Sequence, residues 1–160
     1  MTYAELHALA MLWLADERLA MDVQVLDHRG SVPRECGPRM PATETDVAGT
    51  IGGGHLELKA IEAARGLLAQ GQPGPLDQTY PLGPALGQCC GGTVALRTQL
   101  LSLESLAQWP APAPRFVLQL YGAGHVGRAI AQLLAGIDCD VQWIDEREAE
   151  FPAIALPGHI

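Results

Sequence analysis

The chain has 160 residues, enough for one ordinary domain or two small ones, with 48% hydrophobic and 18% charged residues. Its formal net charge of −8, with Lys59 as the single lysine, argues against nucleic-acid binding because no basic stripe can neutralise phosphates. The longest apolar stretch, residues 8–15, is too short to cross a bilayer and no signal peptide is indicated, so we expect a cytoplasmic, non-membrane protein with reduced cysteines.

The first two thirds of the chain predict an α+β domain. Apolar spacing indicates an amphipathic helix over residues 2–19 and a half-buried strand over residues 21–27. Residues 39–43 and 47–51 are expected to pair as a hairpin, and a helix should run from there to about residue 70. Alternating patterns then predict strands over 77–82 and 93–101.

Three arginines, Arg29, Arg34 and Arg39, fall within eleven residues of a segment rich in glycine and proline. Guanidinium groups suit phosphate and carboxylate ligands, so Arg34 and Arg39 are candidate anion-binding residues. The alternative is that the arginines pair with the chain's surplus of Asp and Glu.

A run of three glycines, Gly52, Gly53 and Gly54, directly precedes the second predicted helix. Glycine permits positive φ, and bare N–H groups at a helix N-terminus form a seat for an anion. His55 follows the glycines, and Glu57 falls at the edge of the apolar face of the helix, where its carboxylate needs a partner or a task. In the alternative interpretation the glycines only form a turn, and Glu57 caps a backbone N–H group.

Gln88 precedes two adjacent cysteines, Cys89 and Cys90, in a second glycine-flanked loop. The pair lacks the spacing and the second ligand pair of a zinc site. It is compatible with a reactive thiol or with a thiophilic metal centre, and alternatively with two small buried residues at a tight turn. Cys139, at the start of a later strand, is expected to lie in the core.

A second, α/β unit follows a proline-rich linker. We place the domains at residues 1–108 and 116–160, with the linker at 109–115. Strands are expected over 116–121 and 140–144, separated by a GxGxxG turn and a helix over 128–134. This context is typical of a dinucleotide-binding unit, in which the glycines meet a diphosphate and an acidic residue takes ribose hydroxyls. The candidate residues there are Gly122, Gly124, His125, Gly127 and Asp145, with a non-phosphorylated ribose favoured.

This second unit is expected to be an incomplete, partial Rossmann-type βαβ domain. Two parallel strands and one helix leave apolar sheet surface uncovered, which predicts either a truncated chain or cover from a partner.

Four segments in this order, 30–40, 49–57, 88–92 and 121–127, resemble the XdhC/CoxI family of xanthine dehydrogenase accessory proteins. The resemblance implies an α+β domain followed by a Rossmann domain, and a chaperone that is not itself an enzyme. It would bind molybdenum cofactor (molybdopterin), assist its sulfuration with a cysteine desulfurase, and deliver it to xanthine dehydrogenase or a related molybdenum hydroxylase. A homodimer is expected, with Cys89 and Cys90 near the metal.

Two other classes of function stay open at this point. One is a nicotinamide-dependent oxidoreductase that holds NAD at Gly122, Gly124, Gly127 and Asp145, with His125 near the chemistry. The other is a non-catalytic interaction subunit whose glycine motifs are structural.

Overall fold

A computed structural model describes residues 1–32, 37–83, 91–111, 113–153 and 157–160. The chain separates into two units by its internal contacts: one is Ala8–Trp109, and the other combines Met1–His7 with Pro110–Ile160. Helix α1 (Tyr3–Ala15) supplies residues to both. No helix in these described ranges is long and apolar enough to cross a membrane.

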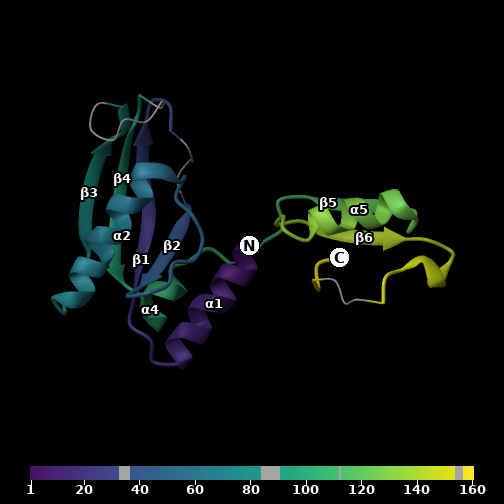
Figure 1. Cartoon of the computed structure of the whole chain (residues 1–160), viewed down its shortest axis with the longest axis horizontal. Helices are drawn as coiled ribbons and strands as arrows, with labels where there is room; N and C mark the ends of the chain where they lie inside the picture. Colours follow the sequence, from purple (N-terminus) through teal and green to yellow (C-terminus); the bar gives the residue numbers. More distant parts are fainter. Residues whose placement is uncertain (33–36, 84–90, 112, 154–156) are drawn as a thin grey trace. The chain divides into compact units, whose positions relative to one another are not determined.

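The first unit is built on a four-stranded antiparallel sheet in the order β2-β1-β4-β3 (Figure 1). Its strands are β1 (Ala20–Arg29), β2 (Arg39–Thr43), β3 (Leu76–Pro81) and β4 (Thr93–Leu100). Helix α2 (Gly54–Ala69) packs on β1, β2 and β4. Val23 and Val25 of β1, Leu96 of β4 and Leu56 of α2 are buried in one core cluster, so the unit is a mixed α/β layer structure.

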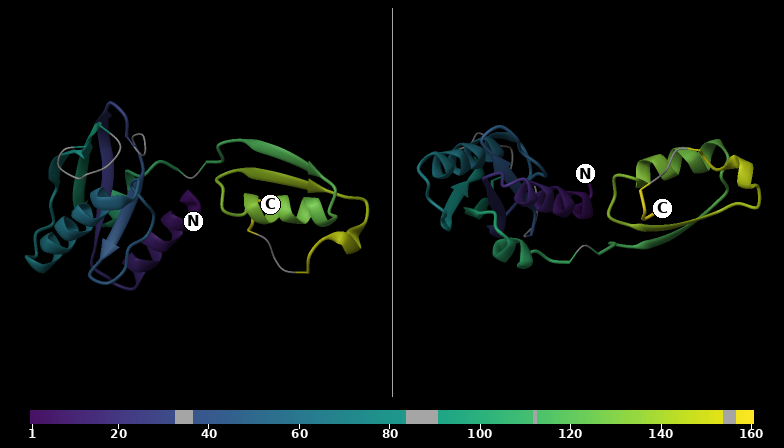
Figure 2. Two further views of the ribbon diagram at one scale, coloured as in Figure 1. Left: turned by 45° about the horizontal axis from the view of Figure 1, so that its top comes forward. Right: turned by 90° about the horizontal axis from the view of Figure 1, so that it is seen from below.

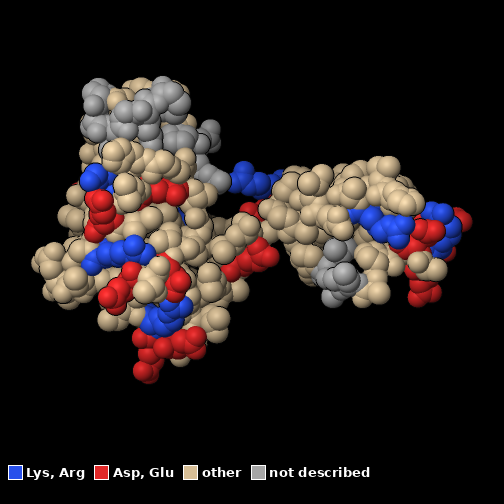
Figure 3. Space-filling model, in the orientation of Figure 1, with Lys and Arg blue, Asp and Glu red and all other residues tan. Residues whose placement is uncertain are grey.

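The predicted apolar face of α2 is confirmed. Its buried residues recur at helical spacing, and they are Leu56, Ala60, Ala64 and Leu67. On the exposed face Lys59 Nζ lies 2.8 Å from Glu62 Oε2, the charge pair expected three residues apart. Figure 3 shows acidic and basic side chains next to one another on this side of the unit. The visible surface therefore carries mixed charge and no basic stripe.

The predicted hairpin between residues 39–43 and 47–51 is wrong in its second arm. In the described residues the pairing is reduced to a single bridge between Ala42 and Val47. The Thr43 hydroxyl accepts hydrogen bonds from the backbone N–H groups of Thr45 (3.3 Å) and Asp46 (2.8 Å). These side-chain bonds form a local turn that competes with a strand ladder.

A short helix, α4 (Leu103–Ala107), follows β4 and was not expected from the sequence. Ser102 caps it, because its hydroxyl accepts the Ser105 N–H while the Ser105 hydroxyl accepts the Ser102 N–H. The helix brings Trp109 back onto the unit, where only 5% of its surface is exposed. Trp109 is therefore a core residue, although the expected linker begins at that position.

The second unit contains two parallel strands, β5 (Val117–Tyr121) and β6 (Asp140–Ile144), connected by α5 (His125–Leu134). Figure 2 shows α5 on one face of the strand pair. Leu134 and Val141 form its small core with Cys139, whose predicted burial is confirmed. The expected uncovered surface is present, since Val117 and Tyr121 of β5 are 72% and 70% exposed. A short 3₁₀ turn, η1 (Glu148–Glu150), follows β6.

Candidate functional site

The triple glycine adopts a backbone conformation that other residues rarely tolerate. Gly52, Gly53 and Gly54 have φ values of +125°, +83° and +68° and lead directly into α2. A side-chain carbon added at Gly53 would meet no atom within 4 Å, so packing does not explain the glycine there. The three glycines are therefore needed for their positive φ values, and the space beside Gly53 is open.

The carboxylate of Glu57 organises this loop from within. Its Oε1 accepts the N–H groups of Ile51 (2.9 Å) and Gly53 (2.8 Å), and it also accepts the Thr50 hydroxyl. The interpretation of Glu57 as a cap for backbone N–H groups is thus confirmed, although these groups belong to the loop and not to the first turn of α2. Glu57 places a negative charge near the N-terminus of α2, where the helix dipole favours it. Gly54 and His55, the first two residues of the helix, are exposed.

Replacing Glu57 with alanine should therefore destabilise the first unit. Because backbone donors lose an ionised acceptor in a half-buried loop, we expect a loss of about 2–3 kcal/mol in the free energy of unfolding, measured by urea denaturation. Glu57→Gln keeps one acceptor oxygen and should therefore lower the free energy of unfolding less than Glu57→Ala does. Glu62→Ala removes only the exposed pair with Lys59 and should cost about 0.5 kcal/mol or less. Equal losses for Glu57→Ala and Glu62→Ala would contradict the capping role.

Arg39 lies inside the first unit and does not face an anion. It is 4% exposed, and its guanidinium pairs with the fully buried Asp22 of the neighbouring strand β1. It also lies over the Trp109 ring at 5.1 Å, and Trp109 Nε1 donates to Asp22 Oδ2 at 3.1 Å. This corrects the expectation that Arg39 binds a ligand. The alternative, pairing with an acidic residue, holds because β1 and β2 place the two side chains together in the sheet.

Burial raises the pKa of Asp22 above its ordinary value of 3.8, although Arg39 and Trp109 act in the opposite direction. Because the folded state holds this proton more tightly, the contribution of Asp22 to the free energy of unfolding is greatest below pH 3.8. It falls as the pH rises through the pKa of Asp22 in the folded state.

The stability of the native chain relative to Asp22→Asn should therefore decline from acidic to neutral pH. Urea denaturation of both proteins across this pH range measures the difference in their free energies of unfolding. The contributions of the other carboxylates are common to both proteins and cancel in this difference. A difference that grows with pH would contradict the direction of the shift.

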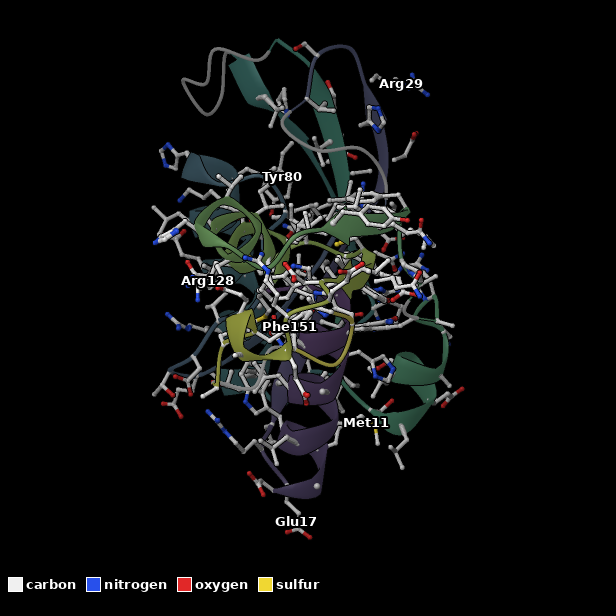
Figure 4. The ribbon with its side chains drawn as sticks, turned by 90° about the vertical axis from the view of Figure 1, so that its right-hand side faces the viewer. Met11, Glu17, Arg29, Tyr80, Arg128 and Phe151 are labelled. Carbon is white, nitrogen blue, oxygen red and sulfur yellow. The ribbon has the colours of Figure 1, made fainter. Side chains whose placement is uncertain are left out.

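Two segments that carry predicted site residues lie outside the described residues, and they include Arg34, Gln88, Cys89 and Cys90. The described residues beside them are in contact. Gly92 N–H donates to the Ser31 carbonyl at 3.0 Å, and a side-chain carbon at Gly92 would lie 2.4 Å from that oxygen. Only glycine permits this approach. Ser31 and Gly92, which flank the two segments, therefore meet at the end of the sheet where β1 ends and β4 begins (Figure 1). The exposed Arg29 projects from the same end of the sheet (Figure 4).

The GxGxxG turn of the second unit connects β5 to α5. Gly122 has a φ of +100°, and its carbonyl accepts Trp143 Nε1 at 2.9 Å. A side-chain carbon at Gly127 would lie 1.8 Å from that carbonyl oxygen, so α5 packs closely against the turn. Nothing lies within 4 Å of the corresponding position at Gly124, so the space beside this glycine is open. His125 begins α5 and is exposed.

Asp145, at the carboxyl end of β6, is held by residues of its own unit. Its Oδ2 accepts Ala123 N–H at 2.6 Å, so it ties the glycine turn to the second strand. Arg147 binds the same carboxylate through its backbone N–H and its guanidinium. The Arg147 side chain first, and then the backbone N–H of Ala123, hold the pKa of Asp145 well below its usual range. The carboxylate is therefore ionised, with internal donors around it.

Several of these residues were not singled out from the sequence. Asp22 and Trp109 are 87 residues apart and meet only because the chain folds back after β4. Arg147 had a sequence signal, since an arginine two residues after the acidic end of a strand can reach that carboxylate. In the described residues no group of three or more His, Cys, Asp or Glu side chains is arranged to hold a metal ion.

Comparison with known proteins confirms the predicted resemblance. Residues 13–80 match the model of the XdhC and CoxI family. The uncharacterized protein YqeB of Escherichia coli K12 is 34% identical over 140 residues, which are 84% of this chain and 24% of YqeB, so the chain spans about a quarter of that relative. A crystal structure described as a xanthine dehydrogenase from Bacillus halodurans matches with a TM-score of 0.68 at 14% identity. It covers 90% of this chain and 63% of that one, and it supports the mixed α/β fold.

Proposed function

Because residues 13–80 match the model of the XdhC and CoxI family, we propose that the chain is an accessory protein that binds molybdenum cofactor as its cargo. It would assist sulfuration of the cofactor and its insertion into xanthine dehydrogenase or a related molybdenum hydroxylase. The family match is the observation that carries the proposal. A cysteine desulfurase and a second copy of the chain are its proposed partners in the cytoplasm.

The contact between Ser31 and Gly92 supports a shared site for the arginine and cysteine segments. In this proposal Arg34 receives the terminal phosphate of the cofactor, because a guanidinium fork binds phosphate through paired hydrogen bonds. Cys89 and Cys90, with Gln88 beside them, supply thiols near the metal. Gly52, Gly53, Gly54 and His55 present backbone to the ligand, and Glu57 holds that backbone in place.

Retention of the cofactor tests this proposal. The chain would be loaded with molybdenum cofactor under anaerobic, reducing conditions and desalted, and its bound pterin measured by fluorescence after oxidation. We expect retention by the native chain and an affinity at least about tenfold lower, equivalent to about 1.4 kcal/mol, for Cys89→Ala with Cys90→Ala. Cys139→Ala removes a buried thiol of the other unit and serves as the control. A native chain that retains no pterin would refute the carrier function.

Nucleotide binding by the second unit is a separate proposal, favoured by the open space at Gly124 beside the close packing at Gly127. The chain would hold a diphosphate at the N-terminus of α5, where backbone N–H groups and the helix dipole favour an anion. The residues that form this site are proposed to be Gly122, Gly124, His125 and Gly127, with Asp145 at its edge.

An oxidoreductase would use this site for hydride transfer, whereas an interaction subunit would leave it empty. Calorimetric titration with nicotinamide nucleotides tests the oxidoreductase alternative, which absence of binding would exclude. An oxidoreductase requires binding, and the carrier function does not.

A further inference from the structure

We propose that the nucleotide site of the second unit selects a nucleotide with a 2′-phosphate on its ribose, and that Arg147 recognises this phosphate. The inference rests on the proposed nucleotide site and adds the chemical class of its ligand. It also reassigns Asp145, the expected partner of ribose hydroxyls, to a positioning role.

Asp145 has no acceptor site left for a ribose hydroxyl. Its Oδ1 accepts the backbone N–H (2.8 Å) and Nε (3.0 Å) of Arg147. Its Oδ2 accepts Ala123 N–H (2.6 Å) and Arg147 Nη2 (2.8 Å). A carboxylate offers about four lone-pair sites, and here four donors use them. Binding of ribose hydroxyls through Asp145 would therefore require these bonds to break.

The exposed fractions of the two side chains also favour Arg147 over Asp145 as the residue that contacts a ligand. The Asp145 side chain is 6% exposed, whereas the Arg147 side chain is 64% exposed. A ligand that approaches the carboxyl ends of β5 and β6 therefore reaches the guanidinium before the carboxylate. This is the place where the ribose of a dinucleotide lies in units with this glycine pattern, and where an arginine accommodates a 2′-phosphate.

Asp145 orients the guanidinium. Two parallel hydrogen bonds, from Nε and Nη2, fix the plane of Arg147, whereas Nη1 makes no bond to Asp145 and lies 3.8 Å from Glu150 Oε1. Because the bonds to Asp145 already order the side chain, less conformational entropy is lost when Nη1 binds a phosphate oxygen.

The surrounding charges set a limit on the affinity. Glu150 Oε1 lies 3.8 Å from Arg147 Nη1, and the same carboxylate lies 3.4 Å from Nη2 of Arg128 on α5. Glu146 and Glu148 are exposed on the same segment and repel an anion. Selectivity must therefore come from the directed guanidinium and not from net charge.

Isothermal titration of the 160-residue chain with NADP and NAD, and with adenosine 2′,5′-bisphosphate and AMP, tests the inference. We expect the 2′-phosphorylated member of each pair to bind at least about tenfold more tightly. Arg147→Ala should remove this preference, and the variant should fold because the side chain is exposed. Arg147→Lys should restore part of it, since lysine keeps the charge but not the fork. Arg115→Ala, an exposed arginine before β5, should leave it unchanged.

The outcomes separate the two proposals. Equal or tighter binding of NAD, or a preference that survives Arg147→Ala, would overturn the role of Arg147 while the nucleotide site stands. Absence of binding by all four nucleotides would overturn both, and the cofactor-carrier proposal for the first unit would be unaffected.

Discussion

Replacing Arg39 with alanine should destabilise the first unit by about 3–5 kcal/mol, the usual cost of leaving one member of a buried ion pair without its partner. Asp22 is fully buried, and among the described residues its carboxylate would keep only the hydrogen bond from Trp109 Nε1 in this variant. The contact between the guanidinium and the Trp109 ring would also disappear. Urea denaturation followed by tryptophan fluorescence measures the loss.

A matched control is available on the same sheet. Arg97 binds Asp77 through two hydrogen bonds of 2.8 and 2.7 Å, but both side chains are substantially exposed. Arg97→Ala should therefore cost about 1 kcal/mol or less. If Arg39→Ala does not fold, Asp22→Asn combined with Arg39→Met should fold, because no charge is then left buried. A cost for Arg39→Ala no larger than that for Arg97→Ala would refute the structural role of the pair.

Replacing Gly127 with alanine should disrupt the turn between β5 and α5, with an expected cost of about 3 kcal/mol or more in the second unit. The added carbon would lie 1.8 Å from the Gly122 carbonyl oxygen and 2.9 Å from its carbon. Because both atoms belong to the backbone, relief requires α5 to move away from the turn. Hydrogen exchange of the β5 and β6 backbone N–H groups measures the loss, and protection in the first unit should be unchanged.

Gly124→Ala is the control for this substitution. Gly124 has a φ of −69°, which alanine tolerates, and a side-chain carbon there would meet no atom within 4 Å. We expect little change in hydrogen exchange for this variant but weaker nucleotide binding, because the carbon fills the proposed diphosphate space. Equal protection in the Gly124 and Gly127 variants would contradict the close packing of α5 on the turn.

Local sequence pattern predicted most of the helices and strands, but not the short helix α4 or, in the described residues, the absence of a second hairpin arm. The apolar spacing of Leu56, Ala60, Ala64 and Leu67 predicted both α2 and its buried face, and the GxGxxG turn between apolar runs predicted the parallel strands. These signals succeed because helix and strand periodicities are properties of neighbouring residues. The resemblance to the XdhC and CoxI family likewise came from short motifs in a fixed order, and the match over residues 13–80 confirmed it.

The charged residues could not be assigned in this way. From the sequence, Arg39 and Asp145 were ligand-binding candidates. In the structure Arg39 pairs with Asp22 from a neighbouring strand, and the carboxylate oxygens of Asp145 accept hydrogen bonds from Ala123 and Arg147. Whether a charged side chain has an internal partner depends on strand register and on chain segments that return from far along the sequence. Residue type and position establish that a charge needs a partner, but only the packed structure decides which one it has.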